Sequence, residues 1–153
     1  MTLDIINRPA GADCAAILAD LPEWFGIPKA NAAYIERAEG DQTWVAEVDG
    51  RALGLMVLAD QGFAAIDIHF LAVRRDVHRQ GVGKALVRKA LSEARARQRS
   101  YLTVKTLGPS RNSEPYERTK AFYRAVGFES LEEFTTIWGP GNACLIMIMA
   151  VRP

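Results

Sequence analysis

One stretch decides the fold of this chain: residues 71–91, which read LAVRRDVHRQGVGKALVRKAL. It begins at the end of an apolar run that starts at Phe63, as expected for a long β-strand. Beyond a turn with two glycines, apolar residues recur at helical spacing from Gly83 to Ala94, which predicts an amphipathic helix of about four turns. A second apolar run, Tyr101 to Thr106, predicts a strand parallel to the first, because a helix joins the two.

Upstream of this unit, the pattern predicts one strand, two helices and a hairpin. The expected elements are a strand at residues 3–7, helices at 12–20 and 28–39, and strands at 43–48 and 52–58. Asp49-Gly50 stands between the last two strands, and this pair readily adopts the positive φ angles of a tight two-residue turn. With the strand at 63–73, three consecutive antiparallel strands are therefore expected.

Downstream, the pattern predicts a helix and two further strands. After a loop at residues 108–115, the helix covers 116–126 and is closed by Gly127. The strands cover 128–138 and 144–151, with a turn at 139–142. The whole order is β-α-α-β-β-β-α-β-α-β-β, which is typical of an α/β fold with a mixed central sheet. A single domain spanning residues 1–153 is expected.

The composition excludes several functions. Hydrophobic residues make up 49% of the chain and the net charge is +1, too little for a nucleic-acid partner bound by bulk electrostatics. The longest apolar run, residues 53–59, is too short to span a bilayer, so no membrane partner is expected. No apolar stretch follows the charges and proline of residues 1–10, so no signal peptide is expected.

Cysteine and histidine are sparse. The chain has two histidines and two cysteines, Cys14 and Cys144, with no Cys-x-x-Cys pair. No metal site is therefore expected. Free thiols suit a reducing compartment, so the expected location is cytoplasmic.

The glycine turn at residues 77–84, VHRQGVGK, predicts an anion site. Glycines let backbone N–H groups converge, and a helix N-terminus adds unpaired donors that suit a pyrophosphate. Two other phosphate motifs fail, because Leu86 stands where a dinucleotide-binding turn needs glycine and Ala85 where a P-loop needs Ser or Thr. The spacing alone leaves open whether the turn binds phosphate or only redirects the chain.

Two segments resemble motifs of the GNAT superfamily of N-acetyltransferases. Residues 71–86 are similar to motif A of that family, in which Q/R-x-x-G-x-G/A follows a strand. Residues 119–128, TKAFYRAVGF, are similar to its A-x-x-F-Y-x-x-x-G-F region. The chain departs from the pattern with His78 at the first position of motif A, Thr119 where alanine is common, and Tyr116 where many members have asparagine. The resemblance covers essentially the whole chain.

The resemblance implies a GNAT-like fold and acetyl-CoA as co-substrate. The sheet is expected to splay between its fourth and fifth strands and to hold the pantetheine arm in the opening. Backbone groups of Leu71, Ala72 and Val73 are expected to bind that arm. The residues expected to bind the pyrophosphate are those of the turn: His78, Arg79, Gln80, Gly81, Val82, Gly83 and Lys84.

Acetyl transfer to an amine needs a base, an oxyanion donor and an acid. An alkylammonium has a pKa of about 10.4, so it must lose a proton before it attacks. Asp67 and His69 are candidate bases, because a strand's period of two places them on one face, and water is the alternative. A backbone N–H near residues 71–73 is the expected oxyanion donor. The resemblance implies that Tyr123 protonates the departing thiolate.

The resemblance also implies that three connections bind the acceptor: residues 24–27, 108–117 and 138–144. Trp24 and Phe25 stand in the first and Trp138 in the last. Aromatic rings there can pack on an apolar or cationic acceptor. Packing within the protein is the alternative role for all three rings.

Together these observations predict an enzyme that moves an acetyl group to a primary amine of a small molecule by direct attack in a ternary complex. A protein N-terminus or lysine is the alternative acceptor. A non-catalytic acyl-CoA-binding domain is the alternative of a different class, and the presence of Tyr123 with Asp67 or His69 argues against it. The sequence identifies neither the acceptor nor the acyl chain, and it is compatible with a homodimer.

Overall fold

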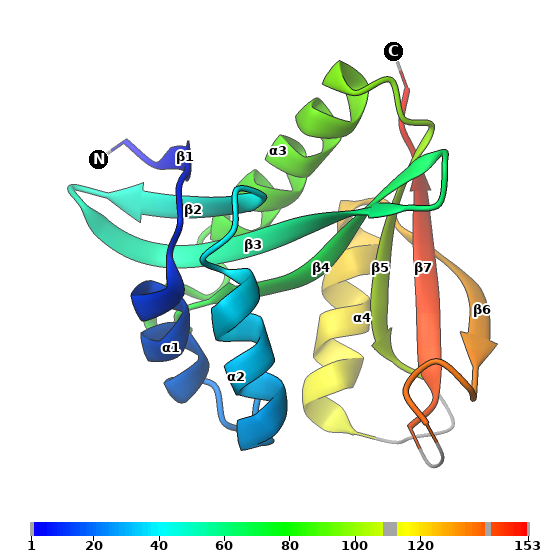
Figure 1. Cartoon of the computed structure of the whole chain (residues 1–153), viewed down its shortest axis with the longest axis horizontal. Helices are drawn as coiled ribbons and strands as arrows, with labels where there is room; N and C mark the ends of the chain where they lie inside the picture. Colours follow the sequence, from blue (N-terminus) through cyan, green and yellow to red (C-terminus); the bar gives the residue numbers. More distant parts are fainter. Residues whose placement is uncertain (1, 109–112, 140–141, 153) are drawn as a thin grey trace. The chain divides into compact units, whose positions relative to one another are not determined.

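The structure is a computed structural model that describes residues 2–108, 113–139 and 142–152. Parts of the predicted loop at 108–115 and of the predicted turn at 139–142 lie outside the described residues. Figure 1 shows the helices and strands in the predicted order: β1 (Asp4–Asn7), α1 (Gly11–Ala19), α2 (Pro28–Arg37), β2 (Thr43–Val48), β3 (Arg51–Gln61), β4 (Ala65–Val73), α3 (Val82–Ala96), β5 (Tyr101–Leu107), α4 (Glu114–Val126), β6 (Glu129–Phe134) and β7 (Cys144–Ala150). A short 3-10 helix that was not predicted, η1 (Arg75–Val77), follows β4.

The strands form one seven-stranded sheet with the order β1-β2-β3-β4-β5-β7-β6. β1, β2 and β3 pair antiparallel, as do β5, β7 and β6. β4 and β5 run parallel, in a register that extends from Ala65 opposite Tyr101 to Ile68 opposite Val104. The predicted α/β fold with a mixed sheet and a parallel strand–helix–strand unit is confirmed.

The chain divides into two compact units. The first comprises the residues up to Ala59 together with His69–Ala90, and the second comprises Asp60–Ile68 together with the residues from Leu91 onward. β4 contributes to both units. Its first residues carry the register with β5, and its last residues lead into η1 and the glycine turn.

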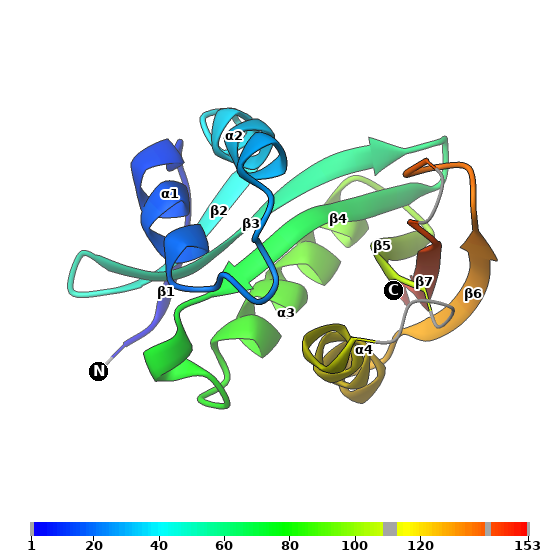
Figure 2. The ribbon, with the colours of Figure 1, turned by 90° about the horizontal axis from the view of Figure 1, so that it is seen from below.

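In the first unit, helices cover both faces of the strands. Figure 2 shows α1 and α2 on one face of β2 and β3, with the start of α3 on the other. The core between α1, α2 and the strands includes Cys14, Ile17, Leu18, Val45, Leu55, Val57, Phe70 and Ala72. The turn between β2 and β3 has φ angles of 49° at Asp49 and 79° at Gly50, so the predicted two-residue turn is confirmed.

Gly54 of β3 fixes the position of the glycine turn in this unit. A Cβ atom there would lie 2.9 Å from the Ala72 carbonyl oxygen, 3.1 Å from a Val73 methyl and 3.3 Å from a Val82 methyl. Only glycine therefore lets β3 pass this close to the end of β4 and the start of α3. The close approach sets where β4 releases the chain into the turn.

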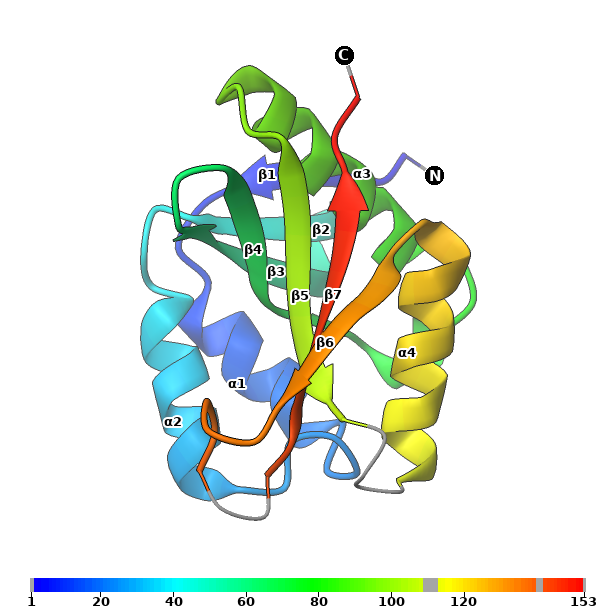
Figure 3. The ribbon, with the colours of Figure 1, turned by 90° about the vertical axis from the view of Figure 1, so that its right-hand side faces the viewer.

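In the second unit, β5, β7 and β6 lie side by side with α4 running along them (Figure 3). Gly127 has a φ of 118° and closes α4 in the left-handed conformation, as predicted. The strand predicted at residues 128–138 is too long, because β6 ends at Phe134. Phe134 pairs with Cys144, the first residue of β7, so the register with that strand ends there.

Among the described residues, no helix is long and apolar enough to cross a membrane. The same residues contain no group of three or more His, Cys, Asp or Glu side chains placed to hold a metal ion.

Candidate functional site

The glycine turn presents backbone donors at the start of α3. Arg79 and Gly81 both have positive φ angles, 63° and 85°. The Gly81 carbonyl accepts the first helical hydrogen bond, 3.0 Å from the Ala85 nitrogen, so the N–H groups of the first helical turn have no partner within the helix. A Cβ atom on Gly81 would meet nothing within 4 Å. The turn therefore combines unpaired donors with open space, which suits a phosphate.

The side chains around the turn are accessible, whereas the strand before it is packed. Arg79, Gln80 and Lys84 are exposed, and Gly83 is half-buried. Val82 and Ala72 are buried, while Leu71 and Val73 are half-buried. All of these predicted cofactor-binding residues belong to one stretch of the first unit.

His78 stabilises the turn itself. Its Nε2 lies 2.8 Å from the Val73 carbonyl oxygen, and since a carbonyl only accepts, the ring donates this hydrogen bond. Its ring also makes an edge contact with Trp24, with 6.1 Å between ring centroids. The structure thus gives His78 a role that motif A did not suggest: it ties the end of β4 to the turn.

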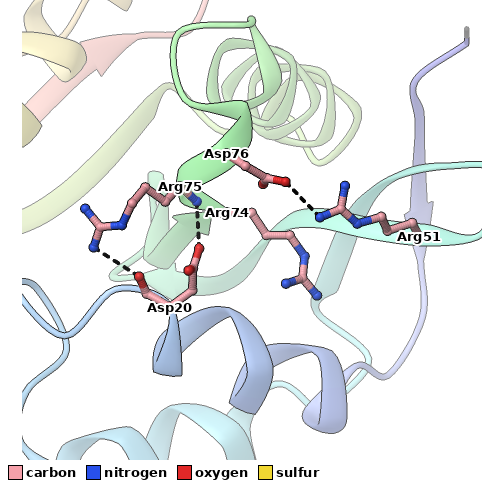
Figure 4. A pocket seen from close by; sticks show the side chains of 5 residues that line it. All are labelled: Asp20, Arg51, Arg74, Arg75 and Asp76. Atoms are coloured by element: carbon pink, nitrogen blue, oxygen red, sulfur yellow. Dashed lines mark hydrogen bonds and ion pairs between the residues drawn. The ribbon is translucent and has the colours of Figure 1, made fainter.

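Arg75 connects the turn to the segment between α1 and α2 (Figure 4). Its backbone N–H donates to Asp20 Oδ2 at 2.8 Å, and its guanidinium donates to the Asp20 carbonyl oxygen at 3.1 Å. The guanidinium also pairs with Glu23 at 2.6 Å and lies 6.0 Å from the Trp24 ring centroid. A hollow of about 320 Å³ lies beside it, lined by Asp20, Arg51, Arg74, Arg75 and Asp76.

The aromatic residues predicted to bind the acceptor occupy different surroundings. Trp24 and Phe25 both pack against the core of the first unit, and Phe25 makes an edge contact with Tyr34 at 5.8 Å. Trp138, in the second unit, is 41% exposed. Trp24 and Phe25 therefore pack within the first unit, and their contact with an acceptor stays a prediction.

His69 lies beside α2. Its ring centroid is 5.9 Å from that of Tyr34, and the ring of its neighbour Phe70 is 4.8 Å from the same tyrosine. Two consecutive strand residues thus both contact Tyr34 of α2. The placement of Asp67 and His69 on one face stays a prediction.

His69 also lines a hollow of about 600 Å³ in the first unit. The other lining residues come from α2, from the segment that follows it, and from β3: Ala33, Glu36, Arg37, Gly40, Asp41, Gln42, Val57 and Leu58. This volume is in the range of ordinary small-molecule sites, about 300–1,000 Å³. Two carboxylates, of Glu36 and Asp41, and the imidazole of His69 thus line the same hollow as the apolar side chains of Val57 and Leu58.

Asp67 is held on both carboxylate oxygens. Thr103 donates a hydrogen bond of 2.7 Å to Oδ1, and Lys105 Nζ lies 3.2 Å from Oδ2. Lys105 in turn donates to Gln61 Oε1 at 2.7 Å. The sequence analysis missed Thr103 and Lys105, because only the β4–β5 register identifies them as neighbours of Asp67. Thr103 and Lys105 thus engage both oxygens of Asp67.

Tyr123 lies on the buried side of α4. It is 6% exposed, and its ring contacts Phe122 and Phe128 with centroids 5.2 and 5.4 Å away. Burial, and in addition the negative charge of Asp67, raises the pKa of Tyr123 well above its ordinary value. The phenol is therefore protonated throughout the physiological range, as a proton donor must be.

Both thiols are poorly suited to nucleophilic catalysis. Burial raises the pKa of Cys14 to about 12. Burial also raises the pKa of Cys144, against the opposing effect of Lys105. A thiol is a nucleophile only as the thiolate, so neither cysteine is poised to carry an acyl group.

Lys120 is a second buried group that sequence reasoning missed. It is 2% exposed and its Nζ donates to Glu117 Oε1 at 2.6 Å, one turn earlier on α4. Lysine is rarely this buried without a partner. The spacing of three residues was the available signal, because such residues are neighbours on a helix.

Comparison with known proteins gives a family match. The model of the Acetyltransferase (GNAT) domain family matches residues 39–130, more than half of the chain. Among curated proteins, none matches the sequence significantly.

Solved structures share the fold over nearly the full length. A GNAT-family protein from Desulfovibrio desulfuricans has a TM-score of 0.84 at 16% identity, covering 99% of this chain and 100% of that one. The ribosomal-protein-S18-alanine N-acetyltransferase from Escherichia coli has a TM-score of 0.71 at 16% identity, with 99% and 96% covered. An aminoglycoside 6'-N-acetyltransferase, solved with coenzyme A, has a TM-score of 0.73 at 16% identity, with 100% and 98% covered.

Proposed function

Because this chain belongs to the GNAT acetyltransferase family, we propose that it transfers an acetyl group from acetyl-CoA to a primary amine of a small molecule. The observation that carries the proposal is the glycine turn. Gly81 leaves open space above unpaired N–H groups at the start of a helix, and a pyrophosphate needs such a surface. The transfer is direct, within a ternary complex, because both thiols are kept protonated by burial.

Residues of the first unit hold the co-substrate. The backbone of Arg79 to Lys84 binds the pyrophosphate, with the exposed side chains of Arg79 and Lys84 adding positive charge. Backbone groups of Leu71 to Val73 bind the pantetheine arm and supply the oxyanion donor. The aminoglycoside acetyltransferase with the same fold was solved with coenzyme A, which supports this assignment.

His69 takes the proton of the amine, directly or through water. The imidazole lines a hollow open to a small molecule, and an unperturbed histidine titrates near neutral pH. Asp67 is the weaker candidate for the base, because Thr103 and Lys105 engage its oxygens. Its proposed role is to hold charge and structure next to the acid.

Tyr123 donates the proton that the departing thiolate takes up. Because burial raises its pKa, the phenol of Tyr123 stays protonated until negative charge develops on the departing sulfur. After the transfer, the tyrosinate recovers its proton from solvent, because its raised pKa makes it a strong base.

A protein N-terminus is the second candidate acceptor. The ribosomal-protein-S18-alanine N-acetyltransferase shares the fold with a TM-score of 0.71. The hollow beside His69 favours a small molecule, because its volume of about 600 Å³ matches a compact ligand. The two free thiols support a cytoplasmic location, and a homodimer stays a prediction that sedimentation would test.

The proposal is tested by release of free CoA thiol from acetyl-CoA. Small primary amines and amino sugars are compared with peptides that carry an N-terminal alanine or an internal lysine, and hydrolysis without amine is the blank. A higher kcat/KM for a small amine supports the proposal. A preference for a peptide would replace the acceptor, and tight CoA binding without turnover on any amine would favour a non-catalytic domain.

A further inference from the structure

We propose that Arg75 is a positioning residue that couples the α1–α2 connection, residues 20–27, to the glycine turn. Acetyl-CoA bound at the turn then orders this connection and prepares the neighbouring hollow for the amine. The inference rests on the proposed function, because it takes the turn as the site of the co-substrate and His69 as a residue of the amine site. It adds a route by which one substrate favours binding of the other.

Arg75 holds the connection at three separate points. Its backbone N–H and its guanidinium bind the side chain and the carbonyl of Asp20, at the end of α1. The guanidinium pairs with Glu23 at 2.6 Å. It also lies over the Trp24 ring. Figure 4 shows Arg75 reaching from η1 to Asp20, so the contacts join segments far apart in the sequence.

His78 adds a second link from the turn to the connection. Its ring makes an edge contact with Trp24, and its Nε2 is fixed on the Val73 carbonyl oxygen. The position of Trp24 therefore depends on the conformation of the turn. His78 begins the turn that is expected to bind the phosphates, and Arg75 lies in η1 just before it. Ordering of the turn can therefore reach Trp24 through both residues.

The connection leads on to the hollow through aromatic contacts. Phe25 follows Trp24 and packs against Tyr34 of α2. Tyr34 in turn contacts His69, which lines the hollow. A chain of ring contacts thus runs from the connection to the proposed base, all of it within the first unit.

The contacts between Arg75 and the α1–α2 connection are weak enough for a bound ligand to change them. Arg75 and Glu23 have side chains that are 46% and 38% exposed, and exposed ion pairs contribute little stability individually. The connection is therefore held by several weak contacts, and ordering of the turn strengthens all of them together. Coupling of this kind is reciprocal, so a bound amine must also tighten binding of CoA.

Hydrogen exchange read by mass spectrometry tests the coupling without turnover. In the wild-type protein, CoA should slow exchange in residues 74–84 and also in residues 20–27. In Arg75→Met, CoA should still protect 74–84 with an affinity within about threefold of wild type, while protection of 20–27 is lost. The KM for the best amine should rise about fivefold or more, with kcat changed less.

Arg51→Met is the matched control. Arg51 pairs with Asp76 of the same 3-10 helix at 2.9 Å and lines the same small hollow, but this ion pair does not involve the α1–α2 connection. This variant should keep the wild-type exchange pattern and KM. Glu23→Gln leaves Arg75 in place and should show a weaker loss of protection in residues 20–27 and a smaller rise in KM than Arg75→Met. This second variant keeps the test valid if Arg75→Met folds poorly.

The outcomes separate the two proposals. Protection of 74–84 without protection of 20–27 in the wild-type protein would overturn the coupling alone. The same holds if 20–27 is protected as well in Arg75→Met and Glu23→Gln as in wild type. If CoA protects neither segment, the proposed co-substrate site fails, and this inference fails with it.

Discussion

Thr103 and Asp67 face each other across the parallel β4–β5 pair, and the threonine hydroxyl donates a hydrogen bond of 2.7 Å to the carboxylate. Lys105 holds the other carboxylate oxygen at 3.2 Å. The negative charge of Asp67 is thereby fixed in the second unit, where it helps to keep Tyr123 protonated. A buried carboxylate that was a candidate base thus contributes to the raised pKa of Tyr123.

Asp67→Asn should move the alkaline limb of the pH–rate profile to lower pH. The charge of Asp67 raises the pKa of Tyr123, so its removal lets the phenol ionise earlier. The variant should also lose about 1–2 kcal/mol of stability in urea unfolding, because Lys105 loses its carboxylate partner. Asp60→Asn is the control: Asp60 pairs with Arg99 at the surface, and such pairs contribute about 0–1 kcal/mol.

His69→Gln should remove the acidic limb of the same profile and lower kcat/KM for the amine. The imidazole lines the hollow proposed for the acceptor, and its protonation would end base catalysis. CoA affinity, measured by calorimetry, should stay at the wild-type value. A profile with an unchanged acidic limb would assign the proton to water or to another group.

Tyr123→Phe should lower kcat by about 10²-fold while the KM for acetyl-CoA stays nearly unchanged. The substitution keeps the ring, which packs between Phe122 and Phe128, so the melting temperature should change little. Steady-state kinetics with the best acceptor measures the effect. Normal turnover by this variant would make Tyr123 a packing residue only.

Alkaline pH should destabilise the protein through Tyr123 and Tyr34. Burial raises the pKa of both Tyr123 and Tyr34 in the folded state, while in the unfolded chain a tyrosine titrates near pH 10. Above about pH 10 the unfolded state has lost protons that the folded state keeps, so the free energy of unfolding falls as pH rises. Below that pH the stabilising contribution is fully present.

Absorbance at 295 nm measures this titration directly. Of the four tyrosines, the buried Tyr123 and the half-buried Tyr34 should ionise late, together with the loss of structure. Tyr123→Phe should reduce the late change in absorbance and flatten the fall of stability with pH. Early ionisation of all four rings in the folded protein would contradict the burial of Tyr123.

Gly81→Ala should weaken CoA binding by more than about tenfold, or 1.4 kcal/mol. The new methyl group enters the open space above the turn. Gly50→Ala is the matched control, because Gly50 also has a positive φ, 79° against 85°, and open space around it. Both variants should lose similar stability from backbone strain, and only Gly81→Ala should lose CoA affinity in calorimetry.

Much of this molecule follows from local sequence pattern. The apolar periodicity of α3, the Asp49-Gly50 turn and Gly127 after α4 were all predictable, because each depends on the conformational preference of a few neighbouring residues. The strand–helix–strand unit follows in the same way, since a helix between two strands of one sheet implies that they are parallel. These local signals also located the turn that is proposed to bind CoA.

Strand ends depended on the partner strand. The β-rich residues after Phe134 read as a continuation of β6, yet the strand stops there because its register with β7 begins at Cys144. A strand is maintained by hydrogen bonds to its neighbour, and the sequence does not state where the neighbour starts.

The chemistry of the candidate site was decided by tertiary structure. The sequence proposed Asp67 and His69 as candidate bases from their spacing on a strand, and the family resemblance proposed Tyr123 as the acid. The sequence did not show that Thr103 and Lys105 engage Asp67, or that His69 lies beside Tyr34 while Trp24 packs on His78. Side-chain type is written in the sequence, but the partners that fix a carboxylate or an imidazole come from strand register and helix packing, which join residues far apart along the chain.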